Sequence, residues 1–273
     1  MGTGEALVHK HHKVLVFDSG VGGLSVLAEI RRRLPCCEFI YACDNAAFPY
    51  GTKEEAELIA RVEDVLKALI ARVAPDIVVI ACNTASTLAL PQIRAHFSKP
   101  VIGVVPAIKP AARLSASRVI GLLATPATVE RPYTRRLIEE FAAGCAVIPV
   151  GSSELVTIAE AKLRGEAPDI AAIARIIAPI FADERVDTLV LACTHFPLLK
   201  PELAQAAPRA VQWIDSGEAI ARRVASFTGE PRNRTDNSPT TFACWLTGNG
   251  PDSGALRDGL SAMGASTIDI IAV

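Results

Sequence analysis

The sequence lacks a net charge, long apolar runs and a large aromatic content. Its 28 basic and 29 acidic side chains give a formal net charge of −1, which does not favour a nucleic acid partner. Its apolar runs fall short of the length that a transmembrane helix needs, so we expect no membrane partner. Aromatic residues make up 5 %, hydrophobic residues 50 % and charged residues 21 %, which is typical of a soluble globular enzyme.

The sequence also lacks the cysteine spacing of a metal site or a disulfide framework. Its seven cysteines show no C-x-x-C pair of the zinc type, and an odd number of thiols argues against disulfides in a reducing compartment. We therefore expect no bound metal. Residues 1–12 are polar and have no apolar core of the kind found in a secretory signal, which predicts a flexible tail and a cytoplasmic protein.

Short runs rich in β-branched residues alternate with longer amphipathic stretches. Several of these runs are apolar at successive positions, as in 77–80 and 189–191, which indicates sheets covered by helices on both faces. The pattern predicts an α/β fold of βαβ units, with doubly wound and mainly parallel sheets. The predicted strands are 14–17, 39–43, 77–81, 119–123, 146–150, 188–192, 211–214 and 242–246.

Two strand-end patterns occur twice. Ala-Cys-Asn-Thr at 81–84 is echoed by Ala-Cys-Thr-His at 192–195, and Phe-Asp-Ser-Gly at 17–20 by Ile-Asp-Ser-Gly at 214–217. With 273 residues, the chain is long enough for two domains. We expect two pseudo-symmetric lobes with a shared cleft, the first formed by residues 13–107 plus 213–273 and the second by residues 108–212.

Cys82 and Cys193 each follow a predicted strand directly. In open α/β sheets the ligand crevice lies at the carboxyl ends of the strands. Asn83 and Thr84 are good helix-capping residues, so the positive end of a helix is expected to favour a thiolate at Cys82. Beside Cys193, the imidazole of His195 can tune the thiol or pass protons to it.

Cysteines are common in protein cores, so packing explains either thiol alone equally well. Two cysteines at equivalent strand ends of two similar lobes, however, would face one another across a cleft, which packing does not require. Removing the α-proton from one face of an amino acid and returning a proton to the other face inverts the centre. This reaction needs two groups that titrate near the working pH, and the pair therefore predicts a two-base racemase.

Asp18 follows the first predicted strand and precedes a glycine-rich turn. Gly20 and Gly22 fit the first part of the dinucleotide motif G-x-G-x-x-G, and Asp44 mimics its ribose-binding acid, but Ser25 replaces the last glycine. A carboxylate at Asp18 would repel a pyrophosphate, whereas it could bind an ammonium group or assist a nearby thiol. We therefore expect no nucleotide cofactor.

Two further segments place polar groups at predicted strand ends. Pro49, Tyr50 and Gly51 form a tight turn before a helix, and Tyr50 with the free amides of this turn could line the cleft. Thr125 and Thr128 flank another strand end. Their hydroxyls fit ordinary helix caps and a binding site for a substrate carboxylate equally well.

Five sequence blocks, which span almost the whole chain in the family's order, resemble the glutamate racemase family. The resemblance implies two pseudo-symmetric lobes, interconversion of L- and D-glutamate without pyridoxal phosphate or another cofactor, supply of D-glutamate for peptidoglycan, and a homodimer. The blocks are Asp-Ser-Gly-Val-Gly-Gly-Leu-Ser at 18–25, Pro-Tyr-Gly at 49–51, Ala-Cys-Asn-Thr-Ala at 81–85, Gly-Val-Val-Pro at 103–106 and Ala-Cys-Thr-His-Phe-Pro-Leu at 192–198.

The same resemblance implies roles for individual residues. Cys82 would act on the face of the D-substrate and Cys193 on the face of the L-substrate, with Asp18 assisting the first thiol and His195 the second. The positions that would hold the substrate are Asp18, Ser19, Pro49, Tyr50, Gly51, Asn83, Thr84, Thr125, Thr128, Thr194 and His195.

One segment departs from the family pattern. Many members have a glutamate soon after the strand corresponding to 146–150, whereas here Gly-Ser-Ser precedes Glu154, which leaves the role of Glu154 open. This segment, with Ala-Lys-Leu at 161–163, is similar to a Gram-negative subgroup. Some members of that subgroup are activated by a cell-wall precursor, which is therefore a candidate partner.

Three other functions share part of this pattern. An aspartate racemase of the same superfamily would have the same lobes and cysteine pair and would differ in the depth of the pocket. A cysteine hydrolase would use one thiolate to attack a carbonyl, with His195 as its base. A non-catalytic binding protein is disfavoured because both lobes keep their cysteine.

Overall fold

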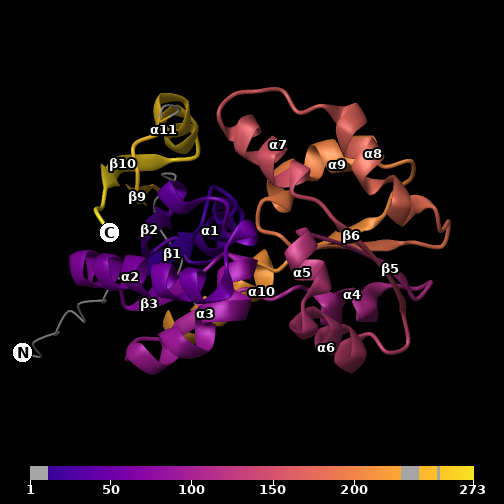
Figure 1. Ribbon diagram of the computed structural model, residues 1–273, viewed down its shortest axis with the longest axis horizontal. Coiled ribbons are helices and arrows are strands. Elements are labelled where there is room, and N and C mark those ends of the chain that lie inside the picture. The colour runs from indigo at the N-terminus through magenta and orange to yellow at the C-terminus, as the bar shows by residue number, and fades with distance from the viewer. Residues whose placement is uncertain (1–11, 229–239, 251–252) are drawn as a thin grey trace, which may run out of the picture.

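The computed structural model describes residues 12–228, 240–250 and 253–273. These residues form two α/β lobes that lie side by side, each built on its own sheet (Figure 1). The expected flexible tail, residues 1–12, lies outside the described residues except for His12. Among the described helices, none is long and apolar enough to cross a membrane.

The sheet of the first lobe has the strand order β10-β9-β2-β1-β3-β4, and its strand pairs are parallel. Helices α1, α10 and α11 cover one face, and α2 and α3 cover the other. The elements are β1 (Lys13–Asp18), α1 (Leu24–Arg33), β2 (Glu38–Cys43), α2 (Glu55–Val73), β3 (Ile77–Ile80), α3 (Asn83–His96), β4 (Val101–Gly103), α10 (Gly217–Thr228), β9 (Phe242–Leu246), α11 (Ser253–Ala262) and β10 (Ala265–Ile270).

The continuous apolar strands explain this arrangement. In β1, Val14 and Val16 point into the core beneath α1, whereas Leu15 and Phe17 point into the core beneath α2. A strand buried on both faces has no polar side to turn towards water, so it must lie inside the sheet. The sequence-based prediction of sheets covered on both faces is confirmed here.

The second lobe has a smaller parallel sheet with the order β6-β5-β7-β8. Helices α4 and α6 pack on one face, and α7, α8 and α9 pack on the other. The elements are α4 (Ile108–Leu114), β5 (Val119–Ala124), α5 (Pro126–Glu130), α6 (Pro132–Phe141), β6 (Ala146–Gly151), α7 (Glu154–Leu163), α8 (Ile170–Phe181), β7 (Thr188–Leu191), α9 (Lys200–Ala206) and β8 (Gln212–Ile214).

The order β6-β5-β7-β8 repeats the order β2-β1-β3-β4 of the first lobe, so the two sheets share one plan. One expected boundary is wrong. Residue 213 was expected to begin the return to the first lobe, but Trp213 pairs with Leu189 of β7 and Ile214 with Val190. The chain instead returns through α10, which packs against α1.

The sequence also missed two strands of the first sheet. β4 has only three residues, which is too short to show a periodic pattern. β10 is an edge strand whose side chains are exposed or half-buried throughout, so it lacks the apolar run of a central strand. Both strands extend the sheet without changing the predicted α/β class.

Candidate active site

A cavity of about 290 Å³ opens between the lobes at the carboxyl ends of β1, β3, β5 and β7. The structure brings together in its wall all the residues that the sequence selected for chemistry or substrate binding. They are Asp18, Ser19, Pro49, Tyr50, Gly51, Cys82, Asn83, Thr84, Thr125, Thr128, Cys193, Thr194 and His195.

The wall also contains residues that sequence reasoning did not select: Phe48, Thr52, Pro126, Ala127, Ser153, Val156, Thr157 and Ala192. Ser153, Val156 and Thr157 come from the start of α7 and lie on one face of the helix, because residues three and four apart are neighbours on a helix surface. Two of the three residues are polar, which is unusual for a helix face that packs into the core. Their helical spacing in the sequence therefore indicates a helix that faces the cleft.

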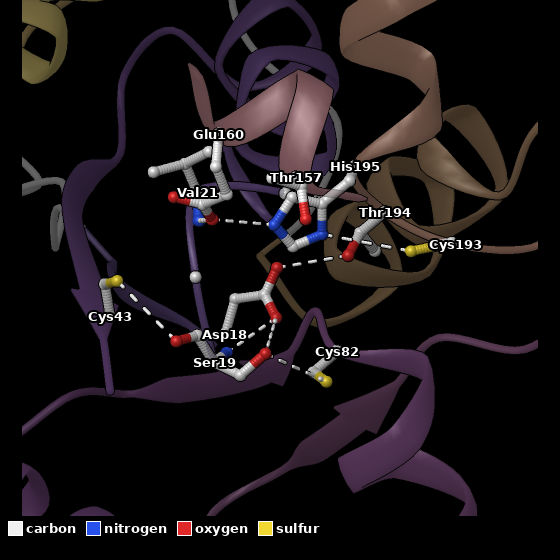
Figure 2. Close-up of polar contacts among 12 residues, drawn as sticks. Asp18, Ser19, Val21, Cys43, Cys82, Thr157, Glu160, Cys193, Thr194 and His195 are labelled. Carbon is white, nitrogen blue, oxygen red and sulfur yellow. Dashed lines mark hydrogen bonds and ion pairs between the residues drawn. The ribbon is translucent and has the colours of Figure 1, made fainter. Parts of the chain in front are cut away.

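On the first lobe, Cys82 caps the amino end of α3 and is buried beside Asp18 and Ser19. Its Sγ lies 3.6 Å from Ser19 Oγ (Figure 2). Burial raises the pKa of the Cys82 thiol, the charge of Asp18 raises it further, and the hydrogen bond from the amide of Ala85 lowers it only in part. The expectation that the helix end favours the thiolate is therefore wrong for this structure, because desolvation outweighs the helix.

Asp18 connects the two lobes. One carboxylate oxygen accepts a hydrogen bond from the amide of Ser19 at 2.6 Å, and the other accepts one from Thr194 Oγ1 at 3.1 Å (Figure 2). Burial raises the pKa of Asp18, while the charge of His195 and these hydrogen bonds oppose the increase. Asp18 is therefore a carboxyl group that can take up a proton more readily than an exposed aspartate.

On the second lobe, Cys193 lies beside a histidine and glutamate pair. His195 Nδ1 is 3.8 Å from Cys193 Sγ, and His195 Nε2 is 2.8 Å from Glu160 Oε1 (Figure 2). Burial lowers the pKa of His195, but its interactions with Cys193 and Glu160 outweigh burial and raise the pKa well above the ordinary value. A cationic imidazole next to Cys193 can stabilise a thiolate there.

Glu160, on α7, is the principal residue that the sequence missed. The amide of Val21 in the first lobe donates to Glu160 Oε1 at 2.8 Å, and Arg164 lies 3.2 Å from Oε2. Burial raises the pKa of Glu160, yet the hydrogen bond and charge of His195 outweigh it, so the pKa is lowered and the carboxylate stays ionised. Glu154, whose role the sequence left open, instead forms an ion pair with Arg175 at the surface.

The glycine-rich turn allows this pair to approach the first lobe. A methyl group on Gly22 would lie 2.5 Å from His195 Nδ1, and one on Gly20 would overlap Glu160 Oε1. Side chains at these positions would push the histidine and glutamate away from the backbone. The two glycines that resemble part of a phosphate-binding motif therefore make room for His195 and Glu160 of the other lobe.

The remaining wall is held by polar contacts outside the cavity. Tyr50 donates to Asp44 Oδ2 at 2.6 Å, and Arg61 binds both oxygens of Asp44 at 2.9 and 2.7 Å. Asp44, which mimicked a ribose-binding acid in the sequence, thus anchors Tyr50. Thr125 accepts a hydrogen bond from the amide of Thr128 as the cap of α5, while both residues also line the cavity.

Most polar groups in the cavity wall are neutral, apart from Asp18 and His195. Among the described residues, neither lysine nor arginine lines it, so hydroxyl and amide groups supply most of its donors. Asn83 Oδ1 is buried without a hydrogen-bond partner. The described residues contain no group of three histidine, cysteine, aspartate or glutamate side chains that could hold a metal ion.

Comparisons with known proteins agree with this geometry. The family model described as Asp/Glu/hydantoin racemase matches residues 24–224. The glutamate racemase of Salmonella typhi is 49 % identical over 263 residues, which cover 95 % of this chain and 92 % of that protein. The chain belongs to the glutamate racemases of this family.

Solved structures of other glutamate racemases have the same fold. The Escherichia coli enzyme, in complex with L-glutamate and the activator UDP-MurNAc-Ala, has a TM-score of 0.90 and 47 % identity, covering 97 % of this chain and 99 % of that one. The Thermus thermophilus glutamate racemase, in complex with β-chloro-D-alanine, has a TM-score of 0.73 and 32 % identity, covering 97 % and 98 % of the two chains. The sequence-based prediction of an enzyme, an amino-acid isomerase, is confirmed.

Proposed function

We propose that this glutamate racemase interconverts L- and D-glutamate with Cys82 and Cys193 as opposed acid and base. The observation that carries the proposal is that both thiols line one cavity from different lobes, each beside its own ionisable partner. A single-base mechanism or a hydrolase would need only one of these thiols.

In the L-to-D direction, the Cys193 thiolate removes the α-proton and the Cys82 thiol delivers a proton to the opposite face. The electron pair of the broken C–H bond remains on the α-carbon and its carboxylate until the new C–H bond forms. His195, cationic and hydrogen-bonded to Glu160, lies beside Cys193, while burial favours the thiol form of Cys82. In the D-to-L direction the two thiols exchange roles.

The wall of the cavity matches the groups of glutamate. The ammonium group needs acceptors, and the unpartnered Asn83 Oδ1 and the buried carboxylate of Asp18 provide them. The two carboxylates need several donors because the described part of the cavity offers no lysine or arginine. Candidate donors for them are the hydroxyls of Ser19, Thr84, Thr125 and Thr128, together with the backbone amides of Gly51, Asn83 and Thr84. The hydroxyls of Tyr50 and Thr194 donate instead to Asp44 and Asp18.

The reaction product fits a role in the cell wall. We propose that the enzyme supplies D-glutamate for peptidoglycan synthesis, acts as a homodimer, and is activated by a cell-wall precursor. The Escherichia coli relative, which was solved with UDP-MurNAc-Ala as activator, supports the last of these proposals. Racemisation should increase when UDP-MurNAc-Ala is added, and light scattering should give twice the chain mass of 28.9 kDa.

The decisive experiment follows the α-proton in D₂O without added cofactor. L-glutamate should give D-glutamate, detected by circular dichroism, and deuterium should replace the α-proton, detected by NMR. L-aspartate in a parallel reaction tests substrate choice. Faster turnover of aspartate would overturn the glutamate assignment, and full racemase activity in a Cys82→Ser or Cys193→Ser variant would overturn the two-thiol mechanism.

A further inference from the structure

Two-thiol racemisation leaves the enzyme in a different protonation state after each turnover. When L-glutamate becomes D-glutamate, Cys193 gains a proton and Cys82 loses one. The free enzyme must move one proton back from Cys193 to Cys82 before it can use a second molecule of L-glutamate. This requirement rests on the proposed function, and the structure contains a route for that proton outside the substrate.

The first half of the route runs from Cys82 to the second lobe. Cys82 Sγ lies 3.6 Å from Ser19 Oγ, and Ser19 Oγ lies 3.4 Å from Asp18 Oδ1 (Figure 2). The other oxygen of Asp18 accepts a hydrogen bond of 3.1 Å from Thr194 Oγ1. A hydroxyl group both donates and accepts, so Ser19 and Thr194 can each pass a proton on.

The second half runs from Thr194 to Cys193. A methyl group on Gly22 would lie 2.7 Å from Thr194 Oγ1 and 2.5 Å from His195 Nδ1, so both atoms flank the same point above this glycine. The two atoms therefore lie within about 5 Å of one another, a gap that one bridging water spans. His195 Nδ1 lies 3.8 Å from Cys193 Sγ, which completes the connection.

We propose that Ser19, Asp18, Thr194 and His195 form a proton relay that resets the two thiols in the free enzyme. After L-to-D turnover, His195 first releases its Nδ1 proton through one bridging water to Thr194, and the Cys193 thiol then gives its proton to the vacated nitrogen. The proton passes through Asp18 and Ser19 to the Cys82 thiolate. The net change is one S–H bond broken at Cys193 and one formed at Cys82, with every relay group restored. The opposite reset follows D-to-L turnover.

The surroundings favour an internal route. Ser19, Asp18, Thr194 and His195 are each 7 % exposed or less, so only a small part of each side chain is open to water in the cavity. A buried chain of hydrogen bonds of this kind polarises cooperatively and stays aligned. Burial also raises the pKa of Asp18, which helps the carboxylate to hold the proton in transit.

Tracer perturbation measures the reset separately from the chemistry. Labelled L- and D-glutamate are brought to equilibrium with the enzyme, and an excess of unlabelled L-glutamate is then added. When the reset is slow, conversion of the unlabelled L-glutamate transiently shifts the ratio of labelled L- to labelled D-glutamate away from its equilibrium value. The readout is a threshold, the lowest glutamate concentration that produces this shift. It is expressed as a multiple of the KM of each variant, so that weaker substrate binding alone does not change it.

We expect Thr194→Val to lower this threshold at least tenfold, and Thr194→Ser, which keeps the hydroxyl, to restore it. Thr157→Val is the matched control, because Thr157 lines the cavity but belongs neither to the relay nor to the candidate substrate donors. If Thr194→Val fails to fold, Ser19→Ala and Ser19→Thr replace this pair with the same expectations.

An unchanged threshold in Thr194→Val, or an equal decrease in Thr157→Val, would overturn the relay. A decrease that persists in Thr194→Ser would also overturn it, because the hydroxyl would then not be the cause. Failure of the proposed function is seen separately, in the serine variants of Cys82 and Cys193. Loss of activity in both of those variants with an unchanged Thr194→Val threshold would reject the relay alone.

Discussion

The two lobes place their cysteines at equivalent positions but surround them differently. In each lobe the thiol follows the third strand of the shared order, β3 for Cys82 and β7 for Cys193. Cys82 faces the buried carboxyl of Asp18, whereas Cys193 faces the cationic His195 with Glu160 behind it. In the proposed mechanism, the repeated backbone places a thiol on each face of the substrate, and the unequal neighbours distinguish the two thiols.

The largest effect should come from removing either thiol. Cys82→Ser and Cys193→Ser should each lower racemisation by about 10²-fold to 10⁴-fold or more, because a hydroxyl is a much weaker base at neutral pH. Each variant should still exchange or eliminate on the side whose thiol remains, which NMR of the α-proton in D₂O would show. Cys36→Ser is the control, since Cys36 is exposed and outside the cavity. An equal loss in this control would contradict the assignment.

The next effect tests the asymmetry of the two sides. Glu160 helps to raise the pKa of His195, so His195 keeps its proton through neutral pH and loses it only in alkaline solution. Glu160→Gln removes the negative charge, and the alkaline decline of L-to-D activity should begin about 1–3 pH units lower. The pH profile of D-to-L activity should shift less, because Cys82 is the base in that direction. Glu154→Gln is the matched control, because Glu154 lies at the surface; an identical shift in both profiles would contradict the asymmetry.

A smaller effect is expected at the contact between the lobes. Gly22→Ala places a methyl group 2.5 Å from His195 Nδ1. The ring or the backbone must move, so we expect a loss of about 1–3 kcal/mol in the free energy of unfolding, together with a lower kcat. Urea denaturation and steady-state kinetics measure the two effects. Gly144→Ala is the control, because a methyl group there meets open space; wild-type behaviour of Gly22→Ala would show that the contact has no role.

The smallest effect concerns the anchor of Tyr50. Tyr50→Phe removes one hydrogen bond to Asp44, which still binds Arg61 and Thr247. A single hydrogen bond contributes about 1 kcal/mol, so we expect KM to rise about fivefold with little change in kcat. Initial-rate measurements in both directions would detect this change. A large decrease in kcat would indicate a part for Tyr50 in the proton transfers themselves.

The sequence predicted the α/β class and the residues at the strand ends, because continuous apolar runs and polar strand ends are local signals. It could not identify Glu160, which reaches His195 only because α7 carries it across to the turn at Gly20. Glu154, which lies soon after a predicted strand end, was instead the glutamate that the sequence pattern indicated. Yet Ser153, Val156, Thr157 and Glu160 follow a helical spacing, which was a readable signal.

The glycine-rich turn shows a second limit of sequence reasoning. A glycine can indicate that another group packs closely against the backbone, but it does not identify that group. At Gly20 and Gly22 the neighbours are Glu160 and His195 of the other lobe, which are separated from the turn by more than a hundred residues of sequence. The burial of Cys82, which outweighs the effect of its helix, likewise depends on packing between distant segments.

The lack of lysine and arginine in the described wall of the cavity has a consequence for how the enzyme responds to salt. Fixed dipoles of hydroxyl and amide groups, unlike lysine or arginine, attract no diffuse layer of counter-ions that added salt could compress. Between about 0.01 and 1 M salt the Debye length falls from about 30 to 3 Å, which weakens recognition by exposed charges. The described wall contains no lysine or arginine, and its ionisable Asp18 and His195 are buried, so selection of a substrate with two carboxylates should stay nearly constant with ionic strength.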